Sequence, residues 1–235
     1  MRCRESGEVL QRSPRQRAQD LVAALARHDP VTGAHLQRLP FYTRLLVEDL
    51  ATHPRHRASL RAAGAVLPQA STLHDVGKLR VSEWILCKRG PLAADEFAAM
   101  KLHTTAGGRA LQELGRLDPE DRFLVLGHDV ALYHHERWNG SGYPFGLRGA
   151  QIPLAARIVA LADVYDALTS ERPYKPAFDH TVARKLILAQ AGAHFDPDVV
   201  EAFLATERNF LDTALRSHKS AVFAAPIAAF TLQAR

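Results

Sequence analysis

The segment Ser71-Thr-Leu-His-Asp-Val-Gly-Lys78 places an imidazole beside a carboxylate, at His74 and Asp75, and adds Lys78 one helical turn further on. Cations such as iron, manganese and zinc accept imidazole and carboxylate ligands, so a metal site is the simplest reason for this combination. A helix cap or a surface pair is the alternative, because a His-Asp dipeptide also arises by chance. The rest of the chain has to decide between these interpretations.

Length and composition favour one compact domain, because 235 residues with 47% hydrophobic side chains can build a substantial core. The formal charge of +5 suits anionic partners such as nucleotides, nucleic acid or acidic membrane surfaces. Much of that charge lies close to the start, at Arg2, Arg4, Arg12, Arg15 and Arg17. Because no base-stacking aromatic repeat, zinc-finger spacing or long basic helix accompanies it, we expect binding to neither DNA nor RNA.

The two cysteines, Cys3 and Cys87, are far apart and indicate no disulfide framework, which favours a reducing compartment. No run approaches the roughly 18 apolar residues that span a bilayer, and the first residues lack the apolar stretch of a signal peptide. We therefore expect a cytoplasmic protein without membrane insertion.

Apolar residues recur with the helical period along most of the chain and never alternate convincingly with period two, so the predicted fold class is all-α. The expected helices start at 17, pass from 35 to 50, and cover 58–65, 93–103, 110–114, 119–136, 153–168, 180–192 and 197–213. Pro40 predicts a kink or boundary, and Gly107-Gly108 predicts a looser segment. His53 and His56 lie in a predicted turn and should face solvent.

Further carboxylates and histidines stand where an apolar helix would not otherwise carry them. Asp163 follows the apolar run Ile158-Val-Ala-Leu-Ala162, and an unpartnered carboxylate buried there would cost several kcal/mol. A metal and a buried salt bridge explain Asp163 equally well. His134 and His135 are adjacent at a predicted helix end, where their side chains either converge on one site or face solvent.

His35 and His103 are single histidines on partly apolar helices, for which a hydrogen-bonded core histidine is the alternative. In chain order the candidates form the series His35, His74-Asp75, His103, His134-His135 and Asp163.

Three segments that carry this series resemble the HD-GYP family, a branch of the HD-domain metal phosphohydrolases. They are His74-Asp-Val-Gly-Lys78, His134-His-Glu-Arg-Trp-Asn-Gly-Ser-Gly-Tyr-Pro144 and Ala162-Asp-Val-Tyr-Asp-Ala-Leu-Thr-Ser-Glu-Arg-Pro-Tyr174. The resemblance covers about Asp29 to Leu204 and implies an all-helical HD-domain bundle with an additional C-terminal helical pair. We accordingly expect a flexible or partly helical arm at 1–16, an HD-GYP-like catalytic domain at 17–213 and a C-terminal tail at 214–235.

The resemblance implies a metal-dependent phosphodiesterase that opens the bacterial messenger cyclic di-GMP to linear pGpG, with a further step to GMP left open. It also implies two divalent cations, iron or manganese before zinc or nickel, which share a hydroxide nucleophile. Carried over by position, the ligands of one metal are His35, His74, Asp75 and Asp163, and those of the other are Asp75, His103, His134 and His135. Asp75 is then the bridging ligand.

The same comparison implies substrate contacts. Lys78, Arg172 and Lys175 match positions that hold phosphate, although solvated surface charge is the alternative for Arg172 and Lys175. Tyr143 lies in the block that gives the family its name and would line the nucleotide pocket. Asp166, one turn after Asp163, would orient a ligand or a water molecule.

Position 31 departs from the pattern of relatives that hold a third metal, because Val31 stands four residues before His35, where they carry a glutamate. We expect two metals unless His28 or Asp29 supplies a ligand. A cyclic-dinucleotide receptor or interaction module with little turnover, and a phosphohydrolase for another cyclic dinucleotide, remain as alternatives. A protein partner in signalling and an oligomeric state are also left open.

Overall fold

The computed structural model describes residues 12–28, 32–171 and 176–223, and these residues form helices without a β-strand among them. The α-helices are α2 (Pro14–His28), α3 (Thr32–Leu50), α4 (Pro54–Ala63), α5 (Leu67–Ala70), α6 (Glu83–Leu86), α7 (Ala94–Gly115), α8 (Arg122–Tyr133), α9 (Leu154–Thr169), α10 (His180–Leu188) and α11 (Pro197–Phe223). The 3-10 helices are η1 (Ser71–Leu73), η2 (Val76–Arg80) and η3 (Gly149–Gln151). The predicted all-α class is confirmed. Within the described ranges, no helix is both long and apolar enough to cross a bilayer.

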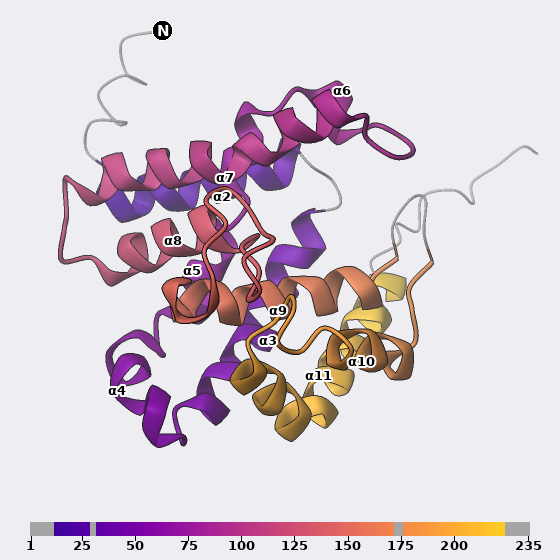
Figure 1. The fold of residues 1–235 in the computed structure, drawn as a ribbon. Helices are drawn as coiled ribbons and strands as arrows, with labels where there is room; N and C mark the ends of the chain where they lie inside the picture. Colours follow the sequence, from indigo (N-terminus) through magenta and orange to yellow (C-terminus); the bar gives the residue numbers. More distant parts are fainter. Residues whose placement is uncertain (1–11, 29–31, 172–175, 224–235) are drawn as a thin grey trace, which may run out of the picture.

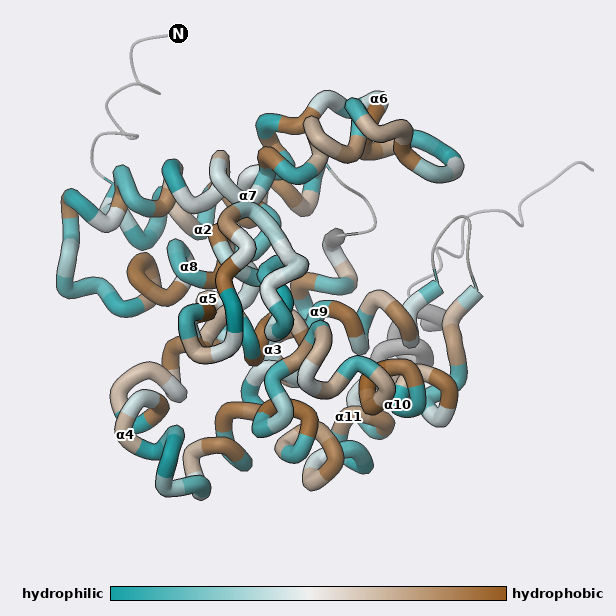
Figure 2. The backbone as a smooth tube through the Cα atoms, in the orientation of Figure 1, coloured by the Kyte–Doolittle hydropathy of each residue, from teal (hydrophilic) through white to brown (hydrophobic). Residues whose placement is uncertain are grey.

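Two clusters of buried apolar side chains hold the helices together. The larger cluster joins α3 and α9 to α10 and α11, and the smaller one joins α2, α7 and α8. Figure 1 shows α2, α7 and α8 on one side of α9, with α10 and α11 on the other. In Figure 2, hydrophobic and hydrophilic stretches alternate along the helices, as amphipathic helices require.

The segment with His74 and Asp75 spans the junction of these clusters. Leu67 belongs to the larger cluster, whereas Leu73 and Val76 belong to the smaller one. Apolar anchors on both sides therefore fix the short helices that carry the imidazole and the carboxylate.

The C-terminal helical pair is confirmed, and aromatic rings fix it to the rest of the fold. Phe210 of α11 stacks on Tyr42 of α3 with ring centroids 4.9 Å apart, and it meets Tyr165 of α9 edge-on at 4.9 Å. Each such ring pair adds about 1 kcal/mol to the burial of its apolar surface. The helix that carries Asp163 is thereby braced from behind.

Pro40 was predicted to cause either a kink or a helix boundary, and the boundary is wrong because Pro40 does not end a helix. α3 continues through Pro40 to Leu50. Leu39 and Tyr42 are fully buried on either side of it. Their packing offsets the backbone hydrogen bond that a proline removes.

The predicted looser segment at Gly107-Gly108 is also wrong, because α7 runs unbroken past both glycines. A Cβ atom added at Gly77 of η2 would lie 1.9 Å from the His103 carbonyl oxygen and 2.5 Å from the Gly107 nitrogen. The glycines therefore allow two backbones to touch, rather than allowing the helix to loosen. This contact brings His103 up to the segment that carries His74 and Asp75.

His53 is exposed as predicted, but the prediction that His56 faces solvent is wrong. His56 is 7% exposed, and its Nε2 atom lies 2.7 Å from Asp198 Oδ2. The pair links α4 to the first turn of α11. A histidine one turn into a helix can point inward when a carboxylate from another helix meets it.

Candidate metal centre

The backbone around His74 and Asp75 is a chain of short helices rather than one long helix. His74 follows η1 directly, and Asp75 precedes η2 with φ −105° and ψ 7°. This break turns both side chains toward one centre, where His74 Nε2 lies 3.1 Å from Asp75 Oδ2. Both residues are buried.

One group of predicted ligands gathers on the α3 and α9 side of this segment. His35, His74 and Asp163 each offer a ligand atom within 4.8 Å of the others. His35 Nε2 lies 3.3 Å from His74 Nε2 and 3.4 Å from Asp163 Oδ1. Residues from three separate parts of the chain thus converge on a volume that suits a single cation.

A second group gathers on the α7 and α8 side. His103, His134 and His135 also offer ligand atoms within 4.8 Å of one another. Asp75 lies between the groups, because its Oδ1 is 3.4 Å from His103 Nε2 and its Oδ2 faces His74. This is the placement that a carboxylate bridging two cations requires.

Four of the imidazoles are held in the same tautomer by an acceptor behind them. The Nδ1–H group of His35 donates to Asp166 Oδ2 at 2.8 Å, and that of His74 donates to Ser71 O at 2.9 Å. The Nδ1–H group of His103 donates to Met100 O at 2.7 Å, and that of His134 donates to Val130 O at 2.9 Å. Each ring therefore presents a bare Nε2 lone pair to the centre, which is the usual arrangement of a metal-ligating histidine.

Several of these atoms have no hydrogen-bond partner within the described ranges. They are Asp75 Oδ1, His103 Nε2 and His134 Nε2, and all are buried. An unsatisfied buried polar atom costs about 1–3 kcal/mol, which a bound cation would remove. The residues therefore fit two divalent cations.

The ionisation states of Asp75 and of three imidazoles agree with this fit, whereas for His74 burial would lower the pKa but the Asp75 carboxylate raises it. Burial lowers the pKa of His103, and burial followed by the neighbouring charge of His74 lowers the pKa of His134 to about 3. Burial and the charge of His134 hold the pKa of His135 well below its ordinary value. Burial would raise the pKa of Asp75, yet the charges of His74 and Lys78 hold it far below its ordinary value. Neutral imidazoles and an ionised carboxylate are the forms that bind metals.

Lys78 lies beside the bridging position. Its Nζ atom is 2.5 Å from Asp75 Oδ2, and its side chain is 22% exposed. The ammonium group is thus next to the centre and partly exposed to solvent.

The loop that follows His134 and His135 folds back over the centre. Tyr143 donates its backbone N–H to His135 O at 3.2 Å, and its ring stacks on the His135 ring at 4.8 Å. The Tyr143-Pro144 peptide bond is cis. Burial, and then the charges of Asp75 and Asp163, raise the pKa of the Tyr143 phenol, which therefore keeps its proton. The predicted pocket residue does lie against the predicted metal ligands.

Two residues that the sequence did not single out support the site. Glu136 is 2% exposed and accepts the backbone N–H groups of Phe145 at 2.7 Å and Leu147 at 3.0 Å. Arg38 donates to both oxygens of Asp166, at 2.6 and 2.9 Å. The sequence could have pointed to both residues, because Glu136 adjoins the predicted ligand His135 and Arg38 lies one helical turn after the predicted ligand His35.

The positions of Val31, Arg172 and Lys175 lie outside the described residues. His28, the alternative source of a further ligand, ends α2 with a buried Nε2 atom that has no hydrogen-bond partner in the described part of the chain. It belongs to neither group of converging ligand atoms.

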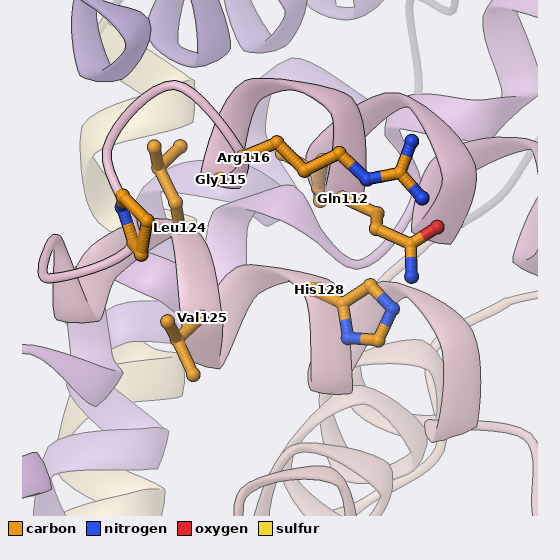
Figure 3. A pocket seen from close by; sticks show the side chains of 8 residues that line it. Gln112, Gly115, Arg116, Leu124, Val125 and His128 are labelled. Carbon is orange, nitrogen blue, oxygen red and sulfur yellow. The ribbon is translucent and has the colours of Figure 1, made fainter.

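Two hollows lie on α7. One, of about 360 Å³ between α7 and α8, is shown in Figure 3 and contains His128 but none of the predicted ligands. The other, of about 450 Å³, lies between η2, α6 and α7 and is lined by Arg80, Arg109 and the predicted ligand His103.

Comparison with known proteins agrees with this geometry. The family model described as HD domain matches residues 21–199, and the chain therefore belongs to the HD-domain family. A cyclic di-GMP phosphodiesterase of Vibrio cholerae is 46% identical over 195 residues, which cover 82% of this chain and 40% of the relative. A probable cyclic di-GMP phosphodiesterase of the same organism is 44% identical, covering 88% of this chain and 49% of the relative. The chain thus spans less than half the length of either relative.

Other relatives act on a different messenger. A 3'3'-cGAMP-specific phosphodiesterase of Vibrio cholerae is 37% identical and covers 83% of this chain and 35% of the relative. Among solved structures, an HD-GYP-type protein of Bdellovibrio bacteriovorus, Bd1817, matches with a TM-score of 0.50 and 19% identity over 72% of this chain and 51% of its own. That likeness concerns the fold. Together these matches confirm the resemblance to the HD-GYP branch.

Proposed function

We propose that the chain is a metal-dependent phosphodiesterase that hydrolyses cyclic di-GMP to linear pGpG. The observation that carries the proposal is the position of Asp75 between two groups of converging imidazoles and carboxylates. The relatives that are named as cyclic di-GMP phosphodiesterases support the choice of substrate. Two bound divalent cations would supply a hydroxide nucleophile at neutral pH, because they lower the pKa of bound water.

The chain's own residues would then bind and orient the reactants. His35, His74 and Asp163 hold one side of the centre, His103, His134 and His135 hold the other, and Asp75 joins them. Lys78 would donate from Nζ to a phosphate oxygen and offset the charge that develops during in-line attack. Tyr143 would line the nucleotide pocket, and Arg172 and Lys175 would hold phosphate.

We propose two metals per chain, with iron or manganese preferred. Mixed imidazole and carboxylate ligands suit both, and Val31 has no ligand atom for a further ion. The test is anaerobic purification with elemental analysis, followed by removal of metal with a chelator and reconstitution with ferrous iron, manganese or zinc. Three tightly bound ions per chain would contradict the proposed stoichiometry.

The decisive assay incubates the reconstituted protein with cyclic di-GMP and separates pGpG from GMP by chromatography. Asp75→Ala should reduce turnover to background while the circular dichroism spectrum stays helical. Turnover retained in Asp75→Ala would refute the bridging role. Binding of cyclic di-GMP without turnover in the metal-loaded wild type would favour the receptor alternative.

A second substrate, 3'3'-cGAMP, has a specific observation in its favour, namely the relatives that are specific for it. Measuring kcat/KM for both messengers under one set of conditions separates the alternatives. The cytoplasmic location, a signalling partner and an oligomeric state stay predictions.

A further inference from the structure

A row of rings leads outward from the candidate centre. Tyr143 stacks on His135 with an interplanar angle of 23°, and Phe97 of α7 meets Tyr143 edge-on at 6.3 Å. Lys101, one turn after Phe97, holds its Nζ atom 5.3 Å from the Phe97 centroid and 5.9 Å from the Tyr143 centroid. The Lys101 ammonium group thus lies between the Phe97 and Tyr143 rings, and the Tyr143 ring covers the predicted metal ligand His135.

The side chains of Phe97 and Lys101 are not fully taken up by contacts within the fold. The Phe97 ring is 47% exposed although it lies beside the site. Lys101 forms no ion pair with a carboxylate in the described part of the chain, whereas Lys78 and Lys88 each do. An exposed ring and an unpaired ammonium group next to a phosphate-handling centre are free to contact a ligand.

The start of α7 holds Phe97 in place. Glu96 is buried, accepts the Ala93 backbone N–H at 2.7 Å and pairs with Lys88 at 2.5 Å. The first turn is therefore fixed, and the adjacent Phe97 is held outward on a rigid helix. A base that stacks there would meet a preorganised surface.

The chemistry of the row fits a purine base. A nucleotide whose phosphate lies at the centre has its base one sugar away, and the rings run outward over that range from His135 through Tyr143 to Phe97. An aromatic side chain is a stacking platform for any base, worth about 1–3 kcal/mol. A lysine adds selectivity, because its ammonium group donates to both N7 and O6 of guanine, whereas adenine presents the N6 amino group, a donor, in place of O6.

We propose that Phe97 stacks on a guanine base of the substrate and that Lys101 reads its N7 and O6 atoms, which makes Lys101 a specificity-determining residue. This inference rests on the proposed phosphodiesterase function. It explains how the chain would favour guanine over adenine at the base next to the scissile phosphate.

The test compares wild type with Lys101→Met and Lys101→Arg, using KM and kcat for cyclic di-GMP and the inhibition constant of cyclic di-AMP. Lys101→Met keeps an unbranched side chain, shorter by one heavy atom, and removes its donors. We expect a rise of about tenfold in KM for cyclic di-GMP, little change in kcat, and an inhibition constant for cyclic di-AMP that changes less than about twofold. Lys101→Arg should restore the preference, because arginine donates to the same atoms.

Two results would overturn the inference. Equal weakening of both messengers in Lys101→Met would mean that Lys101 binds a phosphate, which both share. Unchanged constants for both would mean that Lys101 touches neither base nor phosphate.

Phe97→Leu tests the stacking platform. It should weaken both messengers by about tenfold, because stacking is tolerant of base identity. Phe41→Leu is the matched control, since Phe41 is 52% exposed and carries the Arg44 guanidinium 5.8 Å above its ring. Phe41 lies about 120° around α3 from His35, and its removal should leave both constants unchanged. Equal effects of the two substitutions would contradict the stacking role.

A base-free diester, bis(4-nitrophenyl) phosphate, separates this inference from the proposed function. Wild type that cleaves this diester but not cyclic di-GMP would end the proposed function. Wild type that cleaves cyclic di-GMP, with an unchanged preference in Lys101→Met, would end only the guanine-reading inference. In each case the diester rate reports whether the variant keeps its metal centre.

Discussion

His35 Nδ1 lies 2.8 Å from Asp166 Oδ2, so a carboxylate on α9 fixes the tautomer and the ring orientation of an imidazole on α3. Arg38 donates to both oxygens of the same carboxylate. Burial would raise the pKa of Asp166, but the hydrogen bonds and charges of His35 and Arg38 hold it below its ordinary value. Asp166 therefore stays ionised and makes the His35 Nε2 lone pair a stronger ligand.

Asp166→Asn should weaken metal binding by about 10- to 100-fold, because the neutral amide neither pairs with Arg38 nor raises the basicity of His35. Competition with a chromogenic chelator measures this affinity, and turnover at saturating metal should recover in part. Asp129→Asn is the control, since Asp129 also lies beside an imidazole, His128 at 3.1 Å, but outside both ligand groups. Equal metal affinity in wild type and Asp166→Asn would contradict the positioning role.

The full ligand series was predicted from the resemblance to the HD-GYP family, whereas only some of its members stand out in the sequence as polar groups in an apolar context. His74, Asp75 and Asp163 were conspicuous for that reason, and the structure brings them together with the other predicted ligands. Their role as ligands stays a prediction. The helices were also readable, because the period of 3.6 residues is a local property.

The supporting contacts could not be read from the sequence, because each depends on a partner distant in the chain. Arg38 bonds to Asp166, which is 128 residues away in the chain, and His56 bonds to Asp198, which is 142 residues away. Gly107 was predicted to loosen the chain, whereas in the structure it packs against Gly77. Local patterns describe what a residue prefers, whereas these positions are decided by what packs on them.

Gly77→Ala should destabilise the fold by about 3 kcal/mol or more, because the added Cβ atom would lie 1.9 Å from the His103 carbonyl oxygen and backbone would have to move. The displacement acts on His103, so metal affinity should fall as well. Urea unfolding of the apo protein measures the first effect and chelator competition the second. Gly115→Ala, at a position where nothing lies within 4 Å of the added atom, should be neutral or slightly stabilising. A Gly77→Ala variant as stable as wild type would mean that η2 and α7 do not pack backbone to backbone.

Glu136→Ala should loosen the loop over the centre, because the backbone N–H groups of Phe145 and Leu147 would lose their shared buried acceptor. The expected loss in stability is about 1–3 kcal/mol. Hydrogen exchange should rise at residues 139–149 while α3 and α9 stay protected. Glu113→Ala, an exposed carboxylate on α7, is the control and should alter neither. Uniformly faster exchange in Glu136→Ala would point to a role in global stability instead of loop order.

Asp198 makes stability depend on pH through its contacts with α4. Burial works to raise the pKa of Asp198, but the hydrogen bonds and charges of His56 and Arg55 hold it below the ordinary value of 3.8. The unfolded chain therefore binds the proton more readily than the folded one. The stabilisation is fully present above the unfolded pKa and is lost as the pH falls through the lower, folded pKa.

Asp198→Asn should accordingly lower the free energy of unfolding by about 1 kcal/mol at pH 7, and the difference from wild type should shrink below about pH 4. Urea unfolding at pH 7, 5 and 3.5 measures both quantities. Asp212→Asn, an exposed carboxylate on the same helix, should change stability by less than about 0.5 kcal/mol at each pH. A difference between Asp198→Asn and wild type that persists unchanged at pH 3.5 would show that the side chain acts through packing, because a charge effect must already shrink once the pH falls below the unfolded pKa of the carboxylate.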